Sequence, residues 1–226
     1  MAVKHLFFFD QKAVSLLSLF LTLTIIFFIN QSLVVLFALL PLWFFLFRPL
    51  DKTEIIMFII GSVFIIGQNY SVLKSGGFFF THQDFLLMPY YEPFMWGFYY
   101  LAMKRFINEP NTPKKIGIKP FSGLLITGLS FSFFSHNSDA LIIASLVTIS
   151  VLLIWFHEKY DLYYAGVALT LGFIIEVFGV FSGNWMYPDP DILGIPYWFI
   201  TMWISVGILA RRFLIPLSYW TAKKVF

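Results

Sequence analysis

Long apolar runs separated by short polar segments repeat along the chain from one end to the other. A run such as LLSLFLTLTIIFF (residues 16–28) lacks the alternation of apolar and polar residues that a lipid-facing β-strand shows. Because lipid offers no partner to backbone polar groups, such runs are expected to cross a membrane as helices. Eight spans are predicted, with approximate bounds Ala13–Phe28, Leu33–Phe47, Ile55–Leu73, Phe85–Met103, Phe121–Ser135, Ala140–Phe156, Leu162–Ser182 and Ile195–Leu214.

Composition supports this fold class. Of the 226 residues 59% are hydrophobic and only 12% are charged, whereas a soluble domain carries about 25% charged residues. No segment is long and polar enough to form a separate soluble domain, and no internal sequence repeat is evident. The chain is therefore predicted to be an all-α, polytopic transmembrane helical bundle, with residues 1–226 forming a single integral membrane domain.

The basic residues predict the orientation of the bundle. With eight spans, every one of the 15 Lys and Arg residues except Lys74 falls on the side that carries both termini. Cytoplasmic loops are enriched in Lys and Arg, so both termini are predicted to be cytoplasmic, in a cell membrane of the bacterial inner-membrane type. The net charge of +3 then reflects orientation, and no nucleic-acid partner is expected. The chain has no cysteine, which excludes disulfides and thiolate metal sites.

Two acids lie inside predicted spans, Glu92 in MPYYEPFMW and Glu176 in GFIIEVFGV. Each is about seven residues from the outer end of its predicted helix, which places both roughly 10 Å below the outer boundary. An ionisable side chain at membrane depth is costly and marks a candidate functional site. Glu92 and Glu176 are therefore the candidate catalytic residues.

The neighbours of the two acids predict that they face protein rather than lipid. Gly172, Gly179 and Gly183 share a helical stripe with Glu176, and small residues allow a neighbouring helix to approach closely. Pro93, next to Glu92, is expected to kink or loosen its helix. The candidate substrate-binding residues around the acids are Trp96, Tyr99, Asn69, Trp185, Tyr187 and Trp203.

Other constellations are weaker. His82, Asp84, His136 and Asp139 lie in predicted outer loops, but their spacing matches no stringent metal motif, and solvated loops are the favoured interpretation. No phosphate-binding glycine loop, Ser–His–Asp arrangement or dinucleotide fingerprint occurs. Neither a metal nor a cofactor is predicted.

The segment around Glu176 resembles integral-membrane carotenoid biosynthesis proteins of the bisanhydrobacterioruberin hydratase type. The resemblance rests on Glu176, Gly179, Gly183, Tyr187, Gly194 and Pro196, in that order, within about thirty residues. The paired intramembrane acids are also similar, more loosely, to those of membrane-bound terpene cyclases. The resemblance implies protonation of a carbon–carbon double bond by Glu176, with Glu92 as a second acid or base and aromatic π faces stabilising a cation.

Three functions follow from these observations as hypotheses. The first is a membrane enzyme that uses buried carboxylic acids, kept neutral by their surroundings, for hydration or cyclisation of an isoprenoid or lipid-like substrate. The second is a non-enzymatic subunit or scaffold that packs against a membrane protein partner, as the abundance of Phe would allow. The third is a small proton-coupled transporter in which the two acids relay protons. All three place the chain among membrane lipids.

Overall fold

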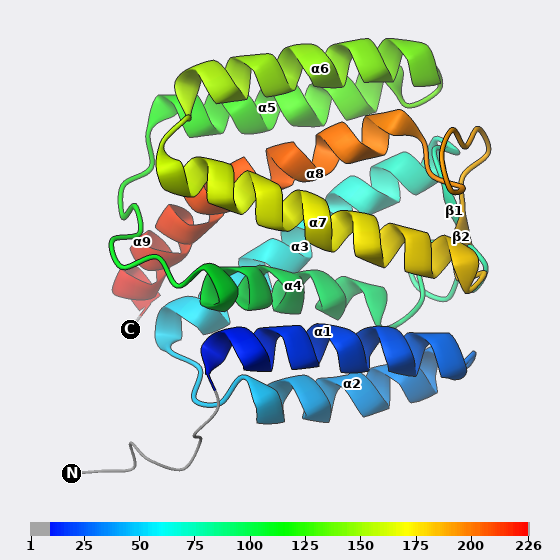
Figure 1. Cartoon of the computed structure of the whole chain (residues 1–226), viewed down its shortest axis with the longest axis horizontal. Helices are drawn as coiled ribbons and strands as arrows, with labels where there is room; N and C mark the ends of the chain where they lie inside the picture. Colours follow the sequence, from blue (N-terminus) through cyan, green and yellow to red (C-terminus); the bar gives the residue numbers. More distant parts are fainter. Residues whose placement is uncertain (1–9, 226) are drawn as a thin grey trace.

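The computed structural model describes residues 10–225, and most of these residues are helical (Figure 1). The prediction of an all-α membrane bundle is confirmed. The helices are α1 (Gln11–Phe28), α2 (Ser32–Leu46), α3 (Lys52–Lys74), α4 (Glu92–Ile107), α5 (Ile118–Phe134), α6 (Ser138–Trp155), α7 (Lys159–Phe181), α8 (Tyr197–Leu209) and α9 (Ile215–Val225). A π-helical segment, η1 (Ala210–Leu214), joins α8 to α9, and two short strands are β1 (Phe79–Phe80) and β2 (Trp185–Met186).

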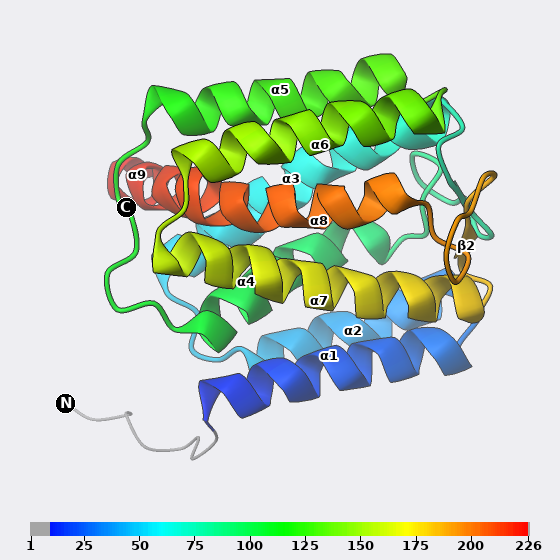
Figure 2. The same ribbon diagram turned by 45° about the horizontal axis from the view of Figure 1, so that its top comes forward.

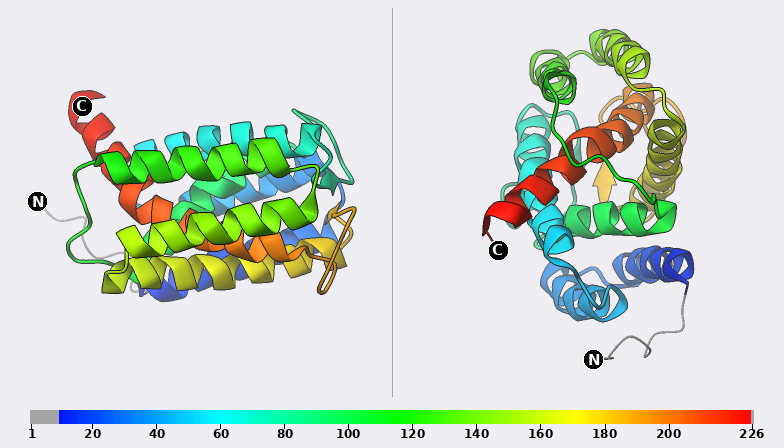
Figure 3. Two further views of the ribbon diagram at one scale, coloured as in Figure 1. Left: turned by 90° about the horizontal axis from the view of Figure 1, so that it is seen from above. Right: turned by 90° about the vertical axis from the view of Figure 1, so that its left-hand side faces the viewer.

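Most of the helices lie side by side along one direction, as expected of a protein that crosses a membrane several times (Figures 1 and 2). Within residues 10–225, α1, α3, α6, α7 and the continuous segment Tyr197–Val225 are long and apolar enough to span a bilayer, and α2 and α5 are shorter apolar helices. The α1–α2 and α5–α6 hairpins lie at opposite edges of the bundle, with α3, α4, α7 and α8 between them (Figure 3). The protein is therefore a multi-pass membrane protein. A total of eight spans stays a prediction.

The fourth predicted span starts too early in the sequence. Residues Phe85 and Met88 exchange backbone hydrogen bonds of 2.9 Å across a tight turn, and Leu86 and Leu87 have φ angles of 52° and 63°. A right-handed helix cannot contain such residues, so α4 begins only at Glu92. Glu92 thus lies at a helix N-terminus, not seven residues inside a helix.

Pro93 does not kink this helix, contrary to the prediction. It occupies the first turn of α4, where a backbone N–H has no intrahelical acceptor and proline is well tolerated. Gly183 also differs from its predicted place. It lies beyond the end of α7 with φ of 73°, in the left-handed conformation that glycine adopts freely.

The structure contains an internal duplication that the sequence alone did not indicate. Residues 11–107 and 118–214 form two similar halves. Each residue of the first half has its equivalent 107 positions later in the sequence, as Asp84 has in Asp191. The helices α3 and α7 both have 23 residues, and both begin with a capping box. Equivalent pairs include Gly76 and Gly183, Asp84 and Asp191, Leu86 and Leu193, Pro89 and Pro196, Trp96 and Trp203, and Arg105 and Arg212.

The two halves meet at a pseudo-two-fold axis. Phe79 of β1 pairs antiparallel with Met186 of β2, and these two residues are equivalents. Trp96 stacks on its equivalent, Trp203, with ring centroids 5.0 Å apart and an interplanar angle of 18°. Self-complementary contacts of this kind are typical of two-fold interfaces. Each half contains four main helices, so the predicted eight spans would make the halves parallel, with the axis along the membrane normal.

Each half is closed by a buried ionic latch at the end opposite the strands. In the first half Glu54 accepts hydrogen bonds from Arg105 at 2.6 Å and from Lys104 at 3.2 Å. In the second half the equivalent Asp161 accepts bonds of 2.6 Å from both Arg211 and Arg212. In this second half both basic residues are arginines and lie in η1.

Candidate functional site

The two candidate acids come from different halves of the duplication and meet between them. Glu92 starts α4, and Glu176 lies near the outer end of α7. Their exposed fractions are only 4% and 6%. The structure therefore brings together two carboxyl groups that sequence reasoning placed only at the same depth.

Neighbouring side chains donate hydrogen bonds to one oxygen of each acid. Glu92 Oε1 accepts a 2.8 Å bond from Trp96 Nε1 and a 3.1 Å bond from Asn69 Nδ2. Glu176 Oε2 accepts bonds of 2.7 Å from Trp185 Nε1 and from the Tyr187 hydroxyl. The two indoles thus present their N–H edges to the acids.

Glycines explain how the indoles reach these positions. A Cβ atom added at Gly179 would overlap the Trp185 ring, and one added at Gly172 would overlap the Trp203 ring. The stripe of small residues on α7 therefore packs against tryptophan side chains. The neighbouring helix α8 contributes the Trp203 ring, whereas the Trp185 ring comes from β2.

Both acids line one cavity, which we call the acid chamber. Its volume is about 40 Å³. Seven of the eight predicted site residues contribute to its wall: Asn69, Glu92, Trp96, Tyr99, Glu176, Trp185 and Tyr187. Trp203 does not, because it lies behind Trp96 with its ring stacked on that indole. Small-molecule sites usually enclose roughly 300 Å³ or more, so the chamber has room for a small polar group but not for an isoprenoid.

A larger apolar groove opens beside the chamber, between α3, α5 and α8, and we call it the α3–α5 groove. Its volume is about 260 Å³. Its wall shares five residues with that of the acid chamber, namely Gln68, Asn69, Trp96, Phe131 and Met202. The groove and the chamber are therefore adjacent, with a polar boundary made by Gln68 and Asn69.

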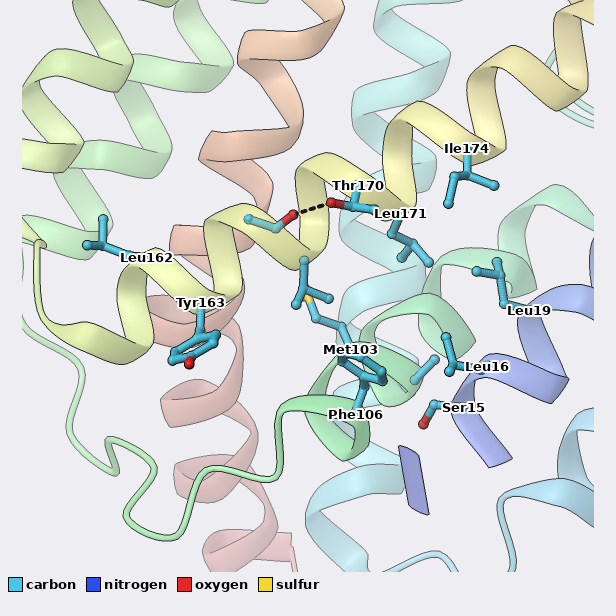
Figure 4. Close-up of a pocket in the computed structure, with 13 residues that line it drawn as sticks. Ser15, Leu16, Leu19, Met103, Phe106, Leu162, Tyr163, Thr170, Leu171 and Ile174 are labelled. Atoms are coloured by element: carbon cyan, nitrogen blue, oxygen red, sulfur yellow. Dashed lines mark hydrogen bonds between the residues drawn. The ribbon is translucent and has the colours of Figure 1, made fainter. Parts of the chain in front are cut away.

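A second groove, the α1–α7 groove, lies between α1, α4 and α7 and has a volume of about 450 Å³ (Figure 4). Leu16, Phe106 and Leu171 are among its apolar walls. Two of its three hydroxyl groups are already satisfied, since Ser15 donates to the Gln11 carbonyl at 2.8 Å and Thr170 to the Gly166 carbonyl at 2.9 Å; the third belongs to Tyr163.

The two grooves are equivalent under the duplication. Five residue pairs at the common offset line both of them: Ile60 and Val167, Phe64 and Leu171, Ala102 and Leu209, Met103 and Ala210, and Phe106 and Phe213. They differ at their polar ends, because only the α3–α5 groove meets the acid chamber. Sequence reasoning missed both grooves, since the residues that form them are ordinary apolar residues from three helices.

The outer loops show no metal centre. Among residues 10–225 no three His, Asp or Glu side chains lie close enough together to hold a metal ion. Asp191 has a structural role instead, because its carboxylate accepts a 2.7 Å bond from the Tyr197 N–H at the start of α8.

Comparisons with known proteins found similarity in structure only. No protein-family model and no curated protein sequence matches the chain. A crystal structure of the mycobacterial Insig homolog MvINS from Mycobacterium vanbaalenii matches with a TM-score of 0.62 at 15% identity. A cross-linked MvINS trimer matches with a TM-score of 0.61 at 16% identity. Both alignments cover 78% of this chain and 98% of the other.

These findings correct the predicted function. The hydratase or cyclase hypothesis is wrong, because the fold is that of an Insig homolog and no resemblance to a carotenoid hydratase is found. The non-enzymatic alternative fits these findings better. The chain thus shares the fold of the Insig homolog MvINS, a polytopic membrane protein.

Proposed function

We propose that this chain is a non-enzymatic membrane subunit that holds a lipid in the α3–α5 groove and receives a helix of a partner protein in the α1–α7 groove. The observation that carries the proposal is the contrast in volume between the acid chamber, at about 40 Å³, and the grooves, at about 260 and 450 Å³. The large cavities are apolar, which suits binding of chains and helices.

The α3–α5 groove suits an amphipathic lipid. Phe64, Phe213 and Leu217 provide apolar walls at membrane depth, where an acyl or isoprenoid chain can lie. At one end Gln68 and Asn69 offer polar groups to a headgroup. A pocket that is mostly apolar with a few polar groups at one end is the usual form of a lipid or small-molecule site.

The α1–α7 groove suits a transmembrane helix. Three helices form its walls, and no residue of its wall belongs to the acid chamber. Gly166 faces the groove, and a Cβ atom added there would contact nothing within 4 Å. Small residues at such positions let the backbone of a partner helix approach closely.

The orientation of the subunit is part of the proposal. We place it in a cell membrane of the bacterial inner-membrane type with both termini in the cytoplasm. The support is the distribution of basic residues, of which only Lys74 lies on the opposite side.

Three glycine variants test the two grooves separately. Gly128 lines the α3–α5 groove, and the nearest atom to an added Cβ there is Gln68 Oε1 at 3.9 Å, so Gly128→Leu should fill the groove without strain. Gly166→Leu should fill the α1–α7 groove in the same way. Gly67→Leu is the matched control, because Gly67 is exposed, has open space around it and lines neither groove.

Each variant is purified gently from membranes, and its retained lipids are measured by mass spectrometry. A photo-reactive residue at exposed position Thr170 reports contact with a partner helix in cells. Gly128→Leu should lower the specific retained lipid to about one tenth of the wild-type amount and leave the cross-link intact. Gly166→Leu should do the reverse. Equal behaviour of all three variants would contradict the proposal.

A further inference from the structure

We infer that the acid chamber binds a primary ammonium group, carried on an apolar chain that lies in the α3–α5 groove. This inference rests on the proposed lipid-binding function and specifies the chemical class of the lipid, a long-chain amine. The argument starts from the two carboxyl groups, because each has an oxygen that nothing in the described chain satisfies.

Glu92 Oε2 and Glu176 Oε1 accept no hydrogen bond from any residue between 10 and 225, although the other oxygen of each acid accepts two. Both side chains are more than nine-tenths buried, and both line the chamber. Buried polar atoms are nearly always hydrogen-bonded. The two free oxygens belong to side chains that line the chamber, so they can accept hydrogen bonds from a group inside it.

The wall of the chamber selects for positive charge. No Lys, Arg or His is among the described residues that line the chamber or the α3–α5 groove. An anionic headgroup would find no cation in this wall. An ammonium group provides three donors, offsets the acidic charge, and can also be attracted by the aromatic rings of Tyr99 and Trp198 in the wall.

The size of the chamber sets the class of headgroup. About 40 Å³ admits an ammonium group, since a single water needs only roughly 10–15 Å³ by the same measure. It does not admit a phosphate-bearing headgroup or a sugar. The chain attached to the nitrogen then leaves past Gln68 and Asn69, which border both spaces.

The duplication shows that the fold does not require these acids. The equivalent of Glu176 in the first half is Asn69, and the equivalent of Glu92 in the second half is Phe199. The same helices and turns are thus built around other side chains. A ligand that binds at the chamber explains why acids occupy these two positions in only one half each. A requirement of helix packing explains it less well, because both halves pack in the same way.

The test compares three twelve-carbon ligands that differ only in their headgroups: dodecylamine, dodecanol and dodecanoate. Affinities are measured by tryptophan fluorescence in phosphatidylcholine nanodiscs at pH 7, with empty nanodiscs subtracted. Wild-type protein should bind dodecylamine about tenfold or more tightly than dodecanol, because charge-assisted hydrogen bonds are the strong ones. Dodecanoate should bind most weakly.

The double variant Glu92→Gln/Glu176→Gln should lose the preference for the amine and keep its affinity for dodecanol, which also shows that the groove is intact. Glu158→Gln is the matched control, because Glu158 is a surface acid outside both cavities, and it should keep the preference. An equal affinity of wild-type protein for amine and alcohol would overturn the inference, as would an amine preference that survives the double variant. If wild-type protein binds none of the three twelve-carbon ligands, the proposed lipid-binding function itself fails.

Discussion

At the scale of single residues, glycines and tryptophans shape the centre of the molecule together. Gly172 and Gly179 leave space for the rings of Trp203 and Trp185. Trp185 then donates to Glu176, and Trp203 stacks on Trp96, which donates to Glu92. The positions of both carboxyl groups therefore depend on the absence of two methyl groups from α7.

Adding a methyl group at Gly172 tests this dependence. Gly172→Ala should destabilise the protein by about 1–3 kcal/mol, because the Trp203 ring must move out of a packed position. Gly166→Ala is the control, and at this exposed helical position alanine should be neutral or stabilising by up to about 1 kcal/mol. Unfolding is followed by tryptophan fluorescence in mixed micelles with increasing dodecyl sulfate. Equal stability of the two variants would show that the Trp203 ring adapts freely.

At the scale of elements, each ionic latch ties the start of one helix to the end of another. Asp161 completes the capping box of α7 through a 3.0 Å bond from the Glu158 N–H and also binds both arginines of η1. Arg211 additionally binds Glu109, in the segment that links the two halves, at 2.6 Å. The latch thus connects α7, η1 and the link between the halves.

Removing the central charge should break this connection. Asp161→Asn should cost about 2–3 kcal/mol, because Arg211 and Arg212 lose their bonds to a buried carboxylate and keep only those to Glu109 and Glu158. Glu158→Gln should cost less than about 1 kcal/mol, since that side chain is 62% exposed.

The hydrogen bond from Arg212 lowers the pKa of Glu158. Its small contribution to stability is therefore present at neutral pH and is lost as the pH falls through that lowered pKa. Thermal unfolding in detergent between pH 7 and pH 3 measures both effects, and a variant Asp161→Asn as stable as Glu158→Gln would contradict this role.

At the scale of the whole molecule, the duplication explains why the bundle has two equivalent grooves and one chamber. Two halves related by a two-fold axis create paired spaces away from the axis and a shared space between them. The paired α1–α7 and α3–α5 grooves and the acid chamber occupy these places. The parallel arrangement also requires the two strands, and the turns that follow them, to lie on one side of the membrane.

This arrangement predicts which loops are accessible from outside. The chain has no cysteine, so single-cysteine variants can be labelled without background. His82→Cys and Asp189→Cys should react with a membrane-impermeant maleimide in intact cells. Lys115→Cys and Lys223→Cys should react only after the cells are broken. Labelling of residues from both groups in intact cells would contradict the predicted orientation.

The all-α class and the membrane setting could be predicted because both depend on local properties of the sequence. A run of apolar residues must pair its own backbone groups in lipid, wherever it lies in the fold. The two acids could be identified as candidates for the same reason, since an ionisable residue within an apolar run is costly in any packing arrangement. Helix starts were harder to predict, because the turns before α4 and α8 depend on left-handed residues such as Leu86 and Leu193, which carry no strong sequence signal.

What the sequence determined by itself was therefore the class of fold and the presence of two acids within apolar runs. Only the tertiary structure decided the volume of the chamber, the existence of the grooves and the equivalence of the halves. A cavity is bounded by side chains from several helices, so its size depends on how they pack and not on any one segment. The duplication is preserved in backbone geometry and in pairs such as Trp96 and Trp203, whereas most of the lipid-facing residues around them are free to differ as long as they stay apolar.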